Sequence, residues 1–466
     1  MVARRRIVVV GGGISGLTAA YRVHARLLDA DVLVLEGSAA LGGKLRLATV
    51  AGVVVDVGAE AMLARRPEGV GLAREVGLQG DVIAPLTTAA QVRAGGAAHP
   101  LPARTMMGIP ADVGAARASG ALTERALDRI AAEPDSDPLA PLEEDVAVGT
   151  LVRSRLGDEV ADRLVEPLLG GVYAGRADEL SLRATMPALA ARLGRDGGSL
   201  VRAARAVIDT GPHDPAAGPV FASLAGGIGS LPGAVVAAGG FAVRTGTTVR
   251  AIRRSSTGFA LECGPVPEPE LVEADAVIVA TPAAKASFLL RDVAPVASAE
   301  LRAVDSASMA VVTFAFRAVP LPVGSGLLVG ATEGFGVKAV TLSSQKWPLE
   351  SGGLTLLRAS VGRARENHLL QRDDDELIAL VRRELRALIG VDAEPVDAIV
   401  TRWGGGLPQY AVGHVELVAR VRAAVAAVPG LAVCGATYDG VGIPACIASA
   451  QAAADQVLAS LRVGGE

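Results

Sequence analysis

The sequence predicts a mixed α/β fold in which a domain with a parallel sheet is assembled from separated parts of the chain. Near the start, the β-branched run Ile7–Val10 leads into a cluster of glycines and an alanine-rich helix. Near the other end, Leu431–Gly435 repeats this order of strand, glycine and helix. Between them, a mainly helical stretch at about 105–210 gives way to β-rich runs such as Met309–Phe316. Short, continuous β-branched strands are typical of a buried parallel sheet.

Length and composition limit the classes of protein to consider. A chain of 466 residues is too long for one ordinary core, so we expect two or three domains. The formal net charge of −4 argues against a dedicated nucleic-acid binder. Cys263, Cys434 and Cys446 lack metal-ligand spacing and are too few for a disulfide scaffold, so we expect no metal site and a reducing, cytoplasmic compartment. Met1 lies almost directly before the first strand, and we therefore expect no signal peptide.

One long stretch without charge, 215–243, has to be tested as a membrane span. A spanning helix needs about 20 continuous apolar residues. Here Pro219, Pro232 and several glycine pairs interrupt the run, so we expect a buried glycine-rich loop and a short helix. The composition, with 50% hydrophobic residues, leaves room for peripheral contact with a membrane but predicts no stable span.

The first glycine-rich turn has the spacing G-x-G-x-x-G. Its residues are Gly11, Gly13, Ile14, Ser15 and Gly16. The first glycine permits the tight turn, the second lets a pyrophosphate approach the backbone, and the third lets the helix pack against the strand. The N-terminus of the helix that carries Leu17–Leu28 then favours an anion. The motif predicts a Rossmann-type dinucleotide site.

The second strand ends in an acid that supports this interpretation. Asp31–Leu35 reads as a strand, and Glu36 follows it twenty residues after Gly16. A carboxylate at this place accepts hydrogen bonds from ribose hydroxyls and disfavours a 2′-phosphate, which argues against NADP.

A second pair of glycines follows soon after this acid, as in flavoprotein oxidases, which the chain resembles here. FAD is long, and the backbone of such proteins passes it again near its phosphates and ribityl chain. Lys44 offers a cation in that region, with a solvated loop lysine as the alternative. The helix from Pro444 to about Leu461 resembles the one whose N-terminus faces the flavin, where its dipole stabilises the anionic reduced ring by about 0.3–2 kcal/mol. The resemblance implies FAD, bound also by Gly42, Gly43, Lys44, Gly58, Ala59, Glu60, Val249, Trp403, Gly435, Val441, Gly442 and Ile443.

These observations give a discontinuous FAD-binding domain of Rossmann type, an antiparallel-sheet substrate domain and a helical insertion. The expected FAD-binding domain comprises 1–62, 218–289 and 425–466. The expected substrate domain comprises 63–104 and 290–424, with a helix at Asp374–Ile389, and 105–217 is the helical insertion.

Four further blocks resemble the porphyrinogen oxidases of haem biosynthesis. They are VEPLLGGVYAG at 165–175, LAGGIGSLP at 224–232, WGGGLPQY at 403–410 and YDGVGIPACI at 438–447. Together with the opening turn they lie in order over nearly the whole chain.

That resemblance implies oxidation of a porphyrinogen to a porphyrin with FAD and molecular oxygen, in three two-electron steps that release hydrogen peroxide. The flavin accepts hydride, so no acid or base residue is assigned, and the five scattered histidines fit this expectation. The protein has to supply orientation, a dry cavity and an electron sink. Transient contact with other enzymes of the haem pathway is a further implication.

The family acts on either of two substrates, and we favour coproporphyrinogen III, which carries four propionates, over protoporphyrinogen IX, which carries two. Four carboxylates require several cations. Within or beside the family blocks, the candidate substrate residues are Gly171, Tyr173, Arg93, Arg176, Lys338, Lys346 and Arg402. Each cation has a surface role as its alternative, and Tyr173, Trp403 and Tyr410 could equally be core aromatics. A family arginine for propionate falls on Ala90, which counts against the protoporphyrinogen mode of binding, with Arg93 as a candidate to take its place.

Two other classes remain as alternatives. A flavin amine oxidase or carotenoid-type desaturase shares the architecture, but an amine oxidase usually places two aromatics beside the flavin, and aromatics make up only 3% of this chain. A non-catalytic FAD-binding or haem-delivery protein would not need the intact glycine turns together with Glu36 and the tail block.

Overall fold

The computed structural model describes residues 4–137, 139, 143–195, 198–210 and 219–463. The expected domain boundary at 217/218, the start of the uncharged stretch (215–218) and part of the proline-rich linker (138 and 140–142) lie outside these residues.

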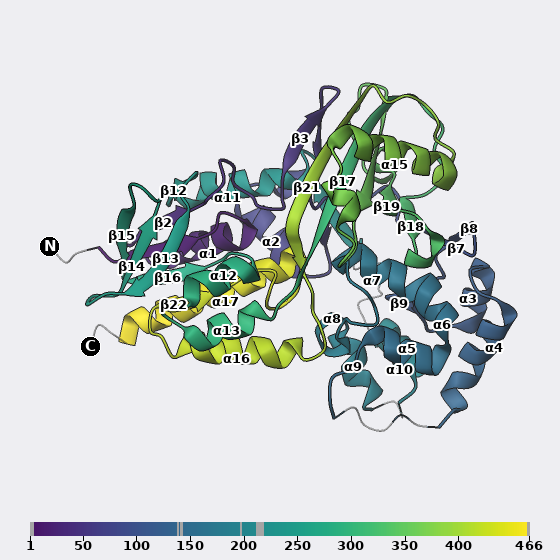
Figure 1. The fold of residues 1–466 in the computed structure, drawn as a ribbon, viewed down its shortest axis with the longest axis horizontal. Helices are drawn as coiled ribbons and strands as arrows, with labels where there is room; N and C mark the ends of the chain where they lie inside the picture. Colours follow the sequence, from purple (N-terminus) through teal and green to yellow (C-terminus); the bar gives the residue numbers. More distant parts are fainter. Residues whose placement is uncertain (1–3, 138, 140–142, 196–197, 211–218, 464–466) are drawn as a thin grey trace.

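The centre of one domain is a five-stranded parallel sheet, as the apolar runs predict. Its strand order is β12-β2-β1-β16-β22, with β1 in the middle. Ile7–Val10 pairs in register with Ala276–Val279 on one side and with Val32–Leu35 on the other. The bounds are β1 Arg6–Val10, β2 Asp31–Leu35, β12 Ala242–Arg244, β16 Ala276–Val279 and β22 Leu431–Val433. Segments from both ends of the chain therefore build one sheet (Figure 1).

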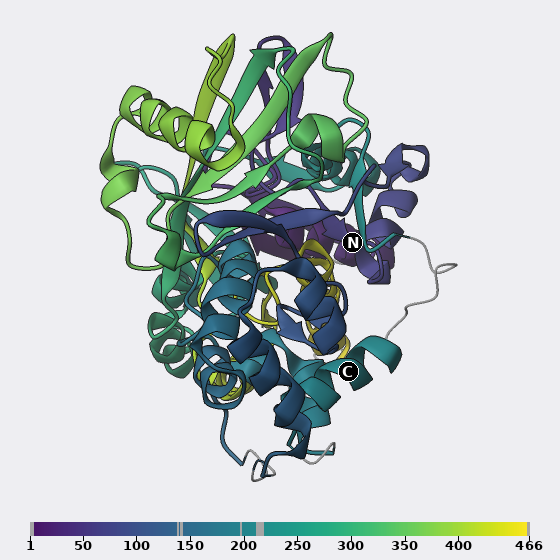
Figure 2. The ribbon, with the colours of Figure 1, turned by 90° about the vertical axis from the view of Figure 1, so that its right-hand side faces the viewer.

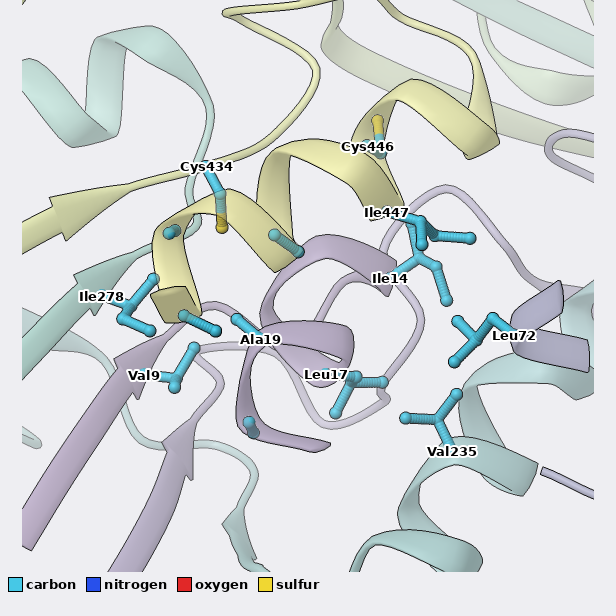
Figure 3. Packing of buried hydrophobic residues seen from close by; sticks show 14 of the residues in the cluster. Val9, Ile14, Leu17, Ala19, Leu72, Val235, Ile278, Cys434, Cys446 and Ile447 are labelled. Atoms are coloured by element: carbon cyan, nitrogen blue, oxygen red, sulfur yellow. The ribbon is translucent and has the colours of Figure 1, made fainter. Parts of the chain in front are cut away.

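Helices cover one face of this sheet, and a second layer covers the other. Val9 and Ile278 of the sheet belong to one buried cluster with helix residues, among them Ala19 and Leu17 of α1 and Ile447 of α17 (Figure 3). The elements there are α1 Ile14–Arg26, α2 Pro67–Glu75, α11 Leu231–Gly239 and α17 Ile443–Val463. The elements opposite are β13 Val249–Arg254, β14 Phe259–Cys263, β15 Glu270–Ala274, α12 Ala283–Leu290, α13 Pro295–Arg302 and α16 His414–Ala426.

The second domain is a seven-stranded sheet with the order β21-β17-β20-β19-β18-β7-β8. Its bounds are β7 Ala90–Ala94, β8 Ala97–Pro100, β17 Ser306–Arg317, β18 Gly326–Val329, β19 Val337–Thr341, β20 Leu354–Val361 and β21 Asp397–Pro408. The sheet is antiparallel except for β18 and β7, which pair in parallel because β7 arrives from a distant part of the chain. Helix α15 (Asp374–Ile389) covers its outer face.

The third part is helical and lies below the seven-stranded sheet in Figure 2. Its helices are α3 Val113–Ser119, α4 Glu124–Ala132, α5 Val148–Leu156, α6 Asp158–Val160, α7 Glu166–Tyr173, α8 Leu182–Thr185, α9 Pro187–Leu193 and α10 Leu200–Thr210. A π-helical turn, Ala161–Val165, precedes α7. In Figure 1, α17 runs from the carboxyl end of the chain to the centre, where its N-terminal end meets the other two parts.

Short pairings complete the fold. They are β3 Leu47–Val50 with β4 Val53–Asp56, β11 Phe221–Leu224 between β5 Met62–Leu63 and β6 Val82–Ile83, and β9 Thr105–Met106 with β10 Ile109–Pro110. The uncharged stretch thus contributes β11 and the short helix α11. Within the part of the chain described, none of the helices combines the length and the apolar character that crossing a bilayer requires.

We propose the three-part division expected from the sequence with one adjustment. Helices α13 and α16 fall in the range assigned to the substrate domain, but their apolar faces pack in the cluster that contains Val8, Val277 and Val433 of the parallel sheet. We therefore group both helices with the FAD-binding domain.

Candidate active site

The glycine-rich turn between β1 and α1 is built for a ligand that touches backbone. Gly11 has a φ of +113°, and a Cβ there would lie 2.8 Å from the Ala280 carbonyl oxygen. A Cβ on Gly16 would lie 1.9 Å from the Gly11 oxygen, so neither position admits a side chain. A Cβ on Gly13 would meet nothing within 4 Å. The turn is therefore tight on the protein side and open above Gly13, at the N-terminus of α1, where a diphosphate fits.

Glu36 lies at the end of β2, beside this turn. Its carboxylate accepts hydrogen bonds from the backbone N–H of Gly12 (2.6 Å) and of Ser38 (2.7 Å). The neighbouring Gly37 approaches Thr248, so the start of β13 and its first residue, Val249, lie along the same edge. This arrangement suits a nucleoside whose ribose hydroxyls meet a carboxylate and whose base lies against backbone.

The second glycine turn folds back onto the first. The Gly42 N–H donates to the Gly12 oxygen at 2.8 Å, and Gly13 and Gly42 form an isolated bridge. The Ala59 N–H donates to the Lys44 oxygen at 3.0 Å, which brings the Gly58–Glu60 segment alongside. A Cβ on Gly58 would lie 1.9 Å from the Lys44 oxygen and 3.1 Å from the Trp403 ring.

Lys44 and Trp403 are both held in this region. Burial lowers the pKa of Lys44, whose charge acts on Cys446 at the start of α17. The Trp403 indole N–H donates to the Val57 oxygen at 3.2 Å, and the Arg46 guanidinium lies 5.4 Å from its ring centroid. The predicted residues Gly42, Gly43, Lys44, Gly58, Ala59 and Trp403 thus form one continuous strip.

The loop between β22 and α17 is clamped by two aromatic side chains. The Tyr410 hydroxyl donates to the Ala436 oxygen (2.5 Å) and accepts from the Gly440 N–H (2.9 Å). The His414 ring stacks on Tyr410 with centroids 4.0 Å apart, and its Nε2–H donates to the Thr437 oxygen at 2.9 Å. Burial lowers the pKa of His414, which favours the neutral ring.

This clamp positions the predicted residues Gly435, Val441, Gly442 and Ile443. Gly435 has a φ of +128°, which favours glycine, and its N–H donates to the Ser449 hydroxyl at 3.2 Å. Helix α17 begins at Ile443, and Cys446 in its first turn interacts electrostatically with Lys44, so the N-terminus of this helix lies beside the strip that contains Lys44.

Glu60, expected to bind FAD, forms ion pairs with two cations. One is Lys346, which we expected to bind the substrate, and the other is Arg358, which was not singled out from the sequence. The Lys346 ammonium lies 2.5 Å from one carboxylate oxygen of Glu60, and the Arg358 guanidinium lies 2.8 Å from the other. Burial alone would raise the pKa of Glu60, but Arg358 and Lys346 outweigh it and hold the pKa below its usual value. Arg358 also donates to the Gly58 oxygen at 2.5 Å. Asp56 also interacts electrostatically with Arg358 and Glu60, so the two cations, Lys346 and Arg358, lie beside two acids next to the strip that contains Gly58.

Arg358 was missed by sequence reasoning, although a signal exists. It is the lone charged residue in the apolar strand LTLLRASV of β20. A charge at such a position has to be paired, and its partners are 298 residues away at Glu60 and 300 residues away at Gly58.

Helix α7 carries the candidate residues Gly171 and Tyr173. Gly171 is exposed, and Tyr173 is buried with its ring centroid 5.6 Å from that of Tyr410. Burial raises the pKa of Tyr173 to about 12. The Gln409 side-chain amide donates to the backbone carbonyl oxygen of Tyr173 at 2.8 Å and so connects α7 with the end of β21. Lys338 of β19 reaches the same helix, with its ammonium 3.5 Å from the Gly170 oxygen.

The three candidate arginines lie elsewhere. Arg402 pairs with Asp374 and donates to the Leu370 and Arg372 carbonyls, so it faces α15 rather than the centre. Arg176 is exposed and pairs with Glu366 at 3.2 Å. Arg93 lies 3.5 Å from Glu333 and 5.1 Å from the centroid of Phe335. None of these three shares a hydrogen bond or ion pair with Glu60, Tyr173 or Lys338 among the interactions of the described chain.

Comparison with known proteins agrees with this geometry. The family model for flavin-containing amine oxidoreductases matches residues 14–458. The coproporphyrinogen III oxidase of Mycobacterium tuberculosis is 39% identical over 468 residues, covering 98% of each chain. The protoporphyrinogen oxidase of Bos taurus is 31% identical, covering 97% of this chain and 98% of the relative. A crystallised Exiguobacterium protein assigned as a protoporphyrinogen oxidase superposes with a TM-score of 0.86 at 34% identity, covering 99% of both chains.

Proposed function

Because the chain belongs to the family of flavin-containing amine oxidoreductases, we propose that it oxidises coproporphyrinogen III to coproporphyrin III, an oxygen-consuming step of haem biosynthesis. The chain is an enzyme of this oxidoreductase family, and FAD is its cofactor. The full-length relatives named coproporphyrinogen III oxidase support the choice of substrate.

The two glycine turns, Glu36 and the strip that contains Lys44 and Trp403, together called the cradle, suit successive parts of FAD along its length. Val249 and Glu36 suit the adenosine, Gly11–Gly16 and the α1 N-terminus suit the diphosphate, and Gly42–Lys44 with Gly58 and Trp403 suit the ribityl chain and ring. When bound, FAD supplies a two-electron acceptor that oxygen can re-oxidise. The N-terminus of α17 contributes oriented N–H groups toward that ring, a preorganised stabilisation of negative charge.

One observation carries the assignment of a large anionic substrate. The seven-stranded sheet is fully packed on its outer face, where Val312, Val340 and Leu357 contact α15. On the inner face, which the cofactor strip borders, Met309, Thr341, Ser360 and Arg358 keep partial exposure. Together with the cations Lys346 and Arg358, these partly exposed positions suit a bulky ligand that carries carboxylates.

The reaction asks the protein for orientation rather than for acid–base catalysis. Coproporphyrinogen III has six hydrogens more than coproporphyrin III, so three two-electron oxidations convert one to the other, and three O2 become three H2O2. Tyr173 and the exposed backbone at Gly171 can guide the macrocycle against the sheet, while the cations fix its carboxylates. We assign no dedicated base for the pyrrole N–H protons that leave during the oxidation.

Two alternatives are kept because specific observations favour them. The Bos taurus relative favours protoporphyrinogen IX as substrate. The family description favours an amine oxidase, but Tyr438, the one candidate for an aromatic wall, packs in the cluster with Val8 and Val433 instead. We further propose that the enzyme works in the cytoplasm, with transient contacts to enzymes that supply its substrate or consume its product.

The test compares both porphyrinogens side by side with the purified holoenzyme. Porphyrin fluorescence and oxygen uptake are followed at equal substrate concentrations, with benzylamine as a third substrate. We expect a higher kcat/KM for coproporphyrinogen III and no amine oxidation. Faster oxidation of protoporphyrinogen IX would replace the substrate, and activity with neither tetrapyrrole would overturn the proposal.

A further inference from the structure

Lys338 is a lysine buried without a counter-charge. Lys338 is 3% exposed, and its ammonium has a single long hydrogen bond, 3.5 Å to the Gly170 carbonyl oxygen. The charged side chain that acts on it is another cation, Arg363. Buried ammonium groups are rare unless paired, because desolvation penalises the charge.

The other cations proposed for the substrate differ from Lys338 in this respect. Lys346 has Glu60, Arg176 has Glu366, and Arg402 has Asp374 as an acidic partner. Arg93 lies near Glu333. In the part of the chain that the structure describes, Lys338 is the candidate cation that lacks a carboxylate within ion-pair distance.

A β-bulge turns Lys338 toward the inner face of the sheet. The register between β19 and β20 shifts between Val337 and Ala339, so Lys338 is the extra residue. Val337 and Val340 on either side pack in the cluster under α15. Lys338 instead reaches across to α7, on the face that remains partly exposed. Bulges often re-aim a side chain beside a functional site.

The part of α7 next to this ammonium carries two adjacent glycines. Gly170 is partly exposed and Gly171 is exposed, although they belong to the helix that covers Lys338. A Cβ on Gly170 would meet only the Gly175 oxygen at 3.8 Å, and one on Gly171 only Leu328 at 3.5 Å. These two residues therefore place no side chain over the Lys338 ammonium, and its hydrogen bond to Gly170, at 3.5 Å, is longer than an ordinary hydrogen bond and weak.

We propose that Lys338 binds one carboxylate of the substrate, in place of its weak bond to the Gly170 carbonyl. The inference rests on the proposed function and adds to it a specific anchor. Arg358 lies opposite Thr341 of β19, about 10 Å along the strand from Lys338. Two cationic positions on one face therefore favour a substrate with several separated carboxylates.

The experiment measures binding of the product, which needs no turnover. Coproporphyrin III, with four carboxylates, and mesoporphyrin IX, with two, are titrated into the holoenzyme and their fluorescence is followed. The variants are Lys338→Met, Lys338→Arg to restore the charge, and Lys285→Met as a matched control on the exposed surface of α12. KM and kcat for coproporphyrinogen III are measured in parallel.

We expect Lys338→Met to weaken coproporphyrin III binding about tenfold, with the loss mainly in KM, and Lys338→Arg to recover most of it. The affinity for mesoporphyrin IX should fall by a smaller factor in Lys338→Met, because a ligand with two carboxylates instead of four occupies the Lys338 position less often. Equal affinities for coproporphyrin III in wild type, Lys338→Met and Lys285→Met would overturn the inference. If the wild type neither binds nor oxidises a tetrapyrrole, the proposed function itself fails, and the two failures are distinguishable.

Discussion

Replacing Lys338 by methionine should stabilise the protein at neutral pH and flatten its stability profile above pH 7. Burial, with a smaller contribution from Arg363, lowers the pKa of Lys338 from 10.5 to about 7. Between pH 7 and 10.5, Lys338 is therefore protonated in the unfolded chain and largely deprotonated in the folded protein. The free energy of unfolding should rise as pH increases from 7 to 10.5, and below pH 7 the full penalty is present.

The magnitude follows from the same two values. They differ by about 3.5, and each pKa unit corresponds to about 1.4 kcal/mol, so the penalty at or below neutral pH is at most about 5 kcal/mol. Lost packing and the lost Gly170 bond reduce the gain, and we expect Lys338→Met to be more stable by about 1–4 kcal/mol at pH 7. For a chain of 466 residues this is a rise of about 1–4 °C in Tm.

The assay is thermal unfolding of wild type, Lys338→Met and Lys285→Met at saturating FAD, from pH 6.5 to 10. Only the difference between variants is used, because other groups titrate in this range. The charged neighbours of Arg363 are Glu366, Glu166 on α7, Glu384 on α15 and Arg176. The reference pKa values of glutamate and arginine both lie outside this window. If the curves of Tm against pH run parallel for wild type and Lys338→Met, the reasoning is refuted. Such curves would mean that the charge of Lys338 does not lower the stability of the folded protein.

Three further substitutions test the cradle. Glu36→Ala removes the carboxylate at the ribose position and should weaken FAD binding at least tenfold in a flavin-fluorescence titration; unchanged affinity would exclude Glu36 from the site. Gly13→Val places a side chain in the open space above the turn and should yield folded, colourless protein; a yellow preparation would show that the diphosphate lies elsewhere. Tyr410→Phe removes both hydrogen bonds to the 436–440 loop and should raise the Kd for FAD about three- to tenfold with a shifted flavin absorption spectrum, whereas an unchanged spectrum would mean that the clamp does not reach the ring.

The local parts of the fold could be predicted because their signals are local. The run Ile7–Val10, the glycine turn and Glu36 all lie within one βαβ unit, and the helix at Asp374–Ile389 has the predicted bounds. Periodicity and turn chemistry decide such elements over a dozen residues. The return of Leu431–Val433 to this domain was expected from a resemblance to the returning strand and helix of FAD oxidases, and the structure places this strand beside β16.

The long-range parts could not be predicted in the same way. Lys346 and Glu60 are 286 residues apart, and nothing local in either segment says that they pair. Arg402 was chosen by its nearness to a family block, but β-strand alternation sends its side chain to the α15 side, while Trp403 next to it faces the cofactor strip. Neighbouring residues of a strand point to opposite faces of the sheet. A sequence block shared with a family therefore indicates where the backbone runs, but not which face a given side chain takes.

The inner face of the sheet has an uneven distribution of charge, and this unevenness can orient a substrate. At the end near Gly58, the acids Glu60 and Asp56 balance Lys346 and Arg358, so a carboxylate arriving there competes with bound carboxylates for both cations. At the end under α7, Lys338 has no such competitor. A polycarboxylate therefore gains most by placing one carboxylate at Lys338, because that contact relieves an unpaired buried charge. The remainder of the macrocycle is then directed along the face toward the cofactor strip, which couples substrate selection to the orientation that electron transfer requires.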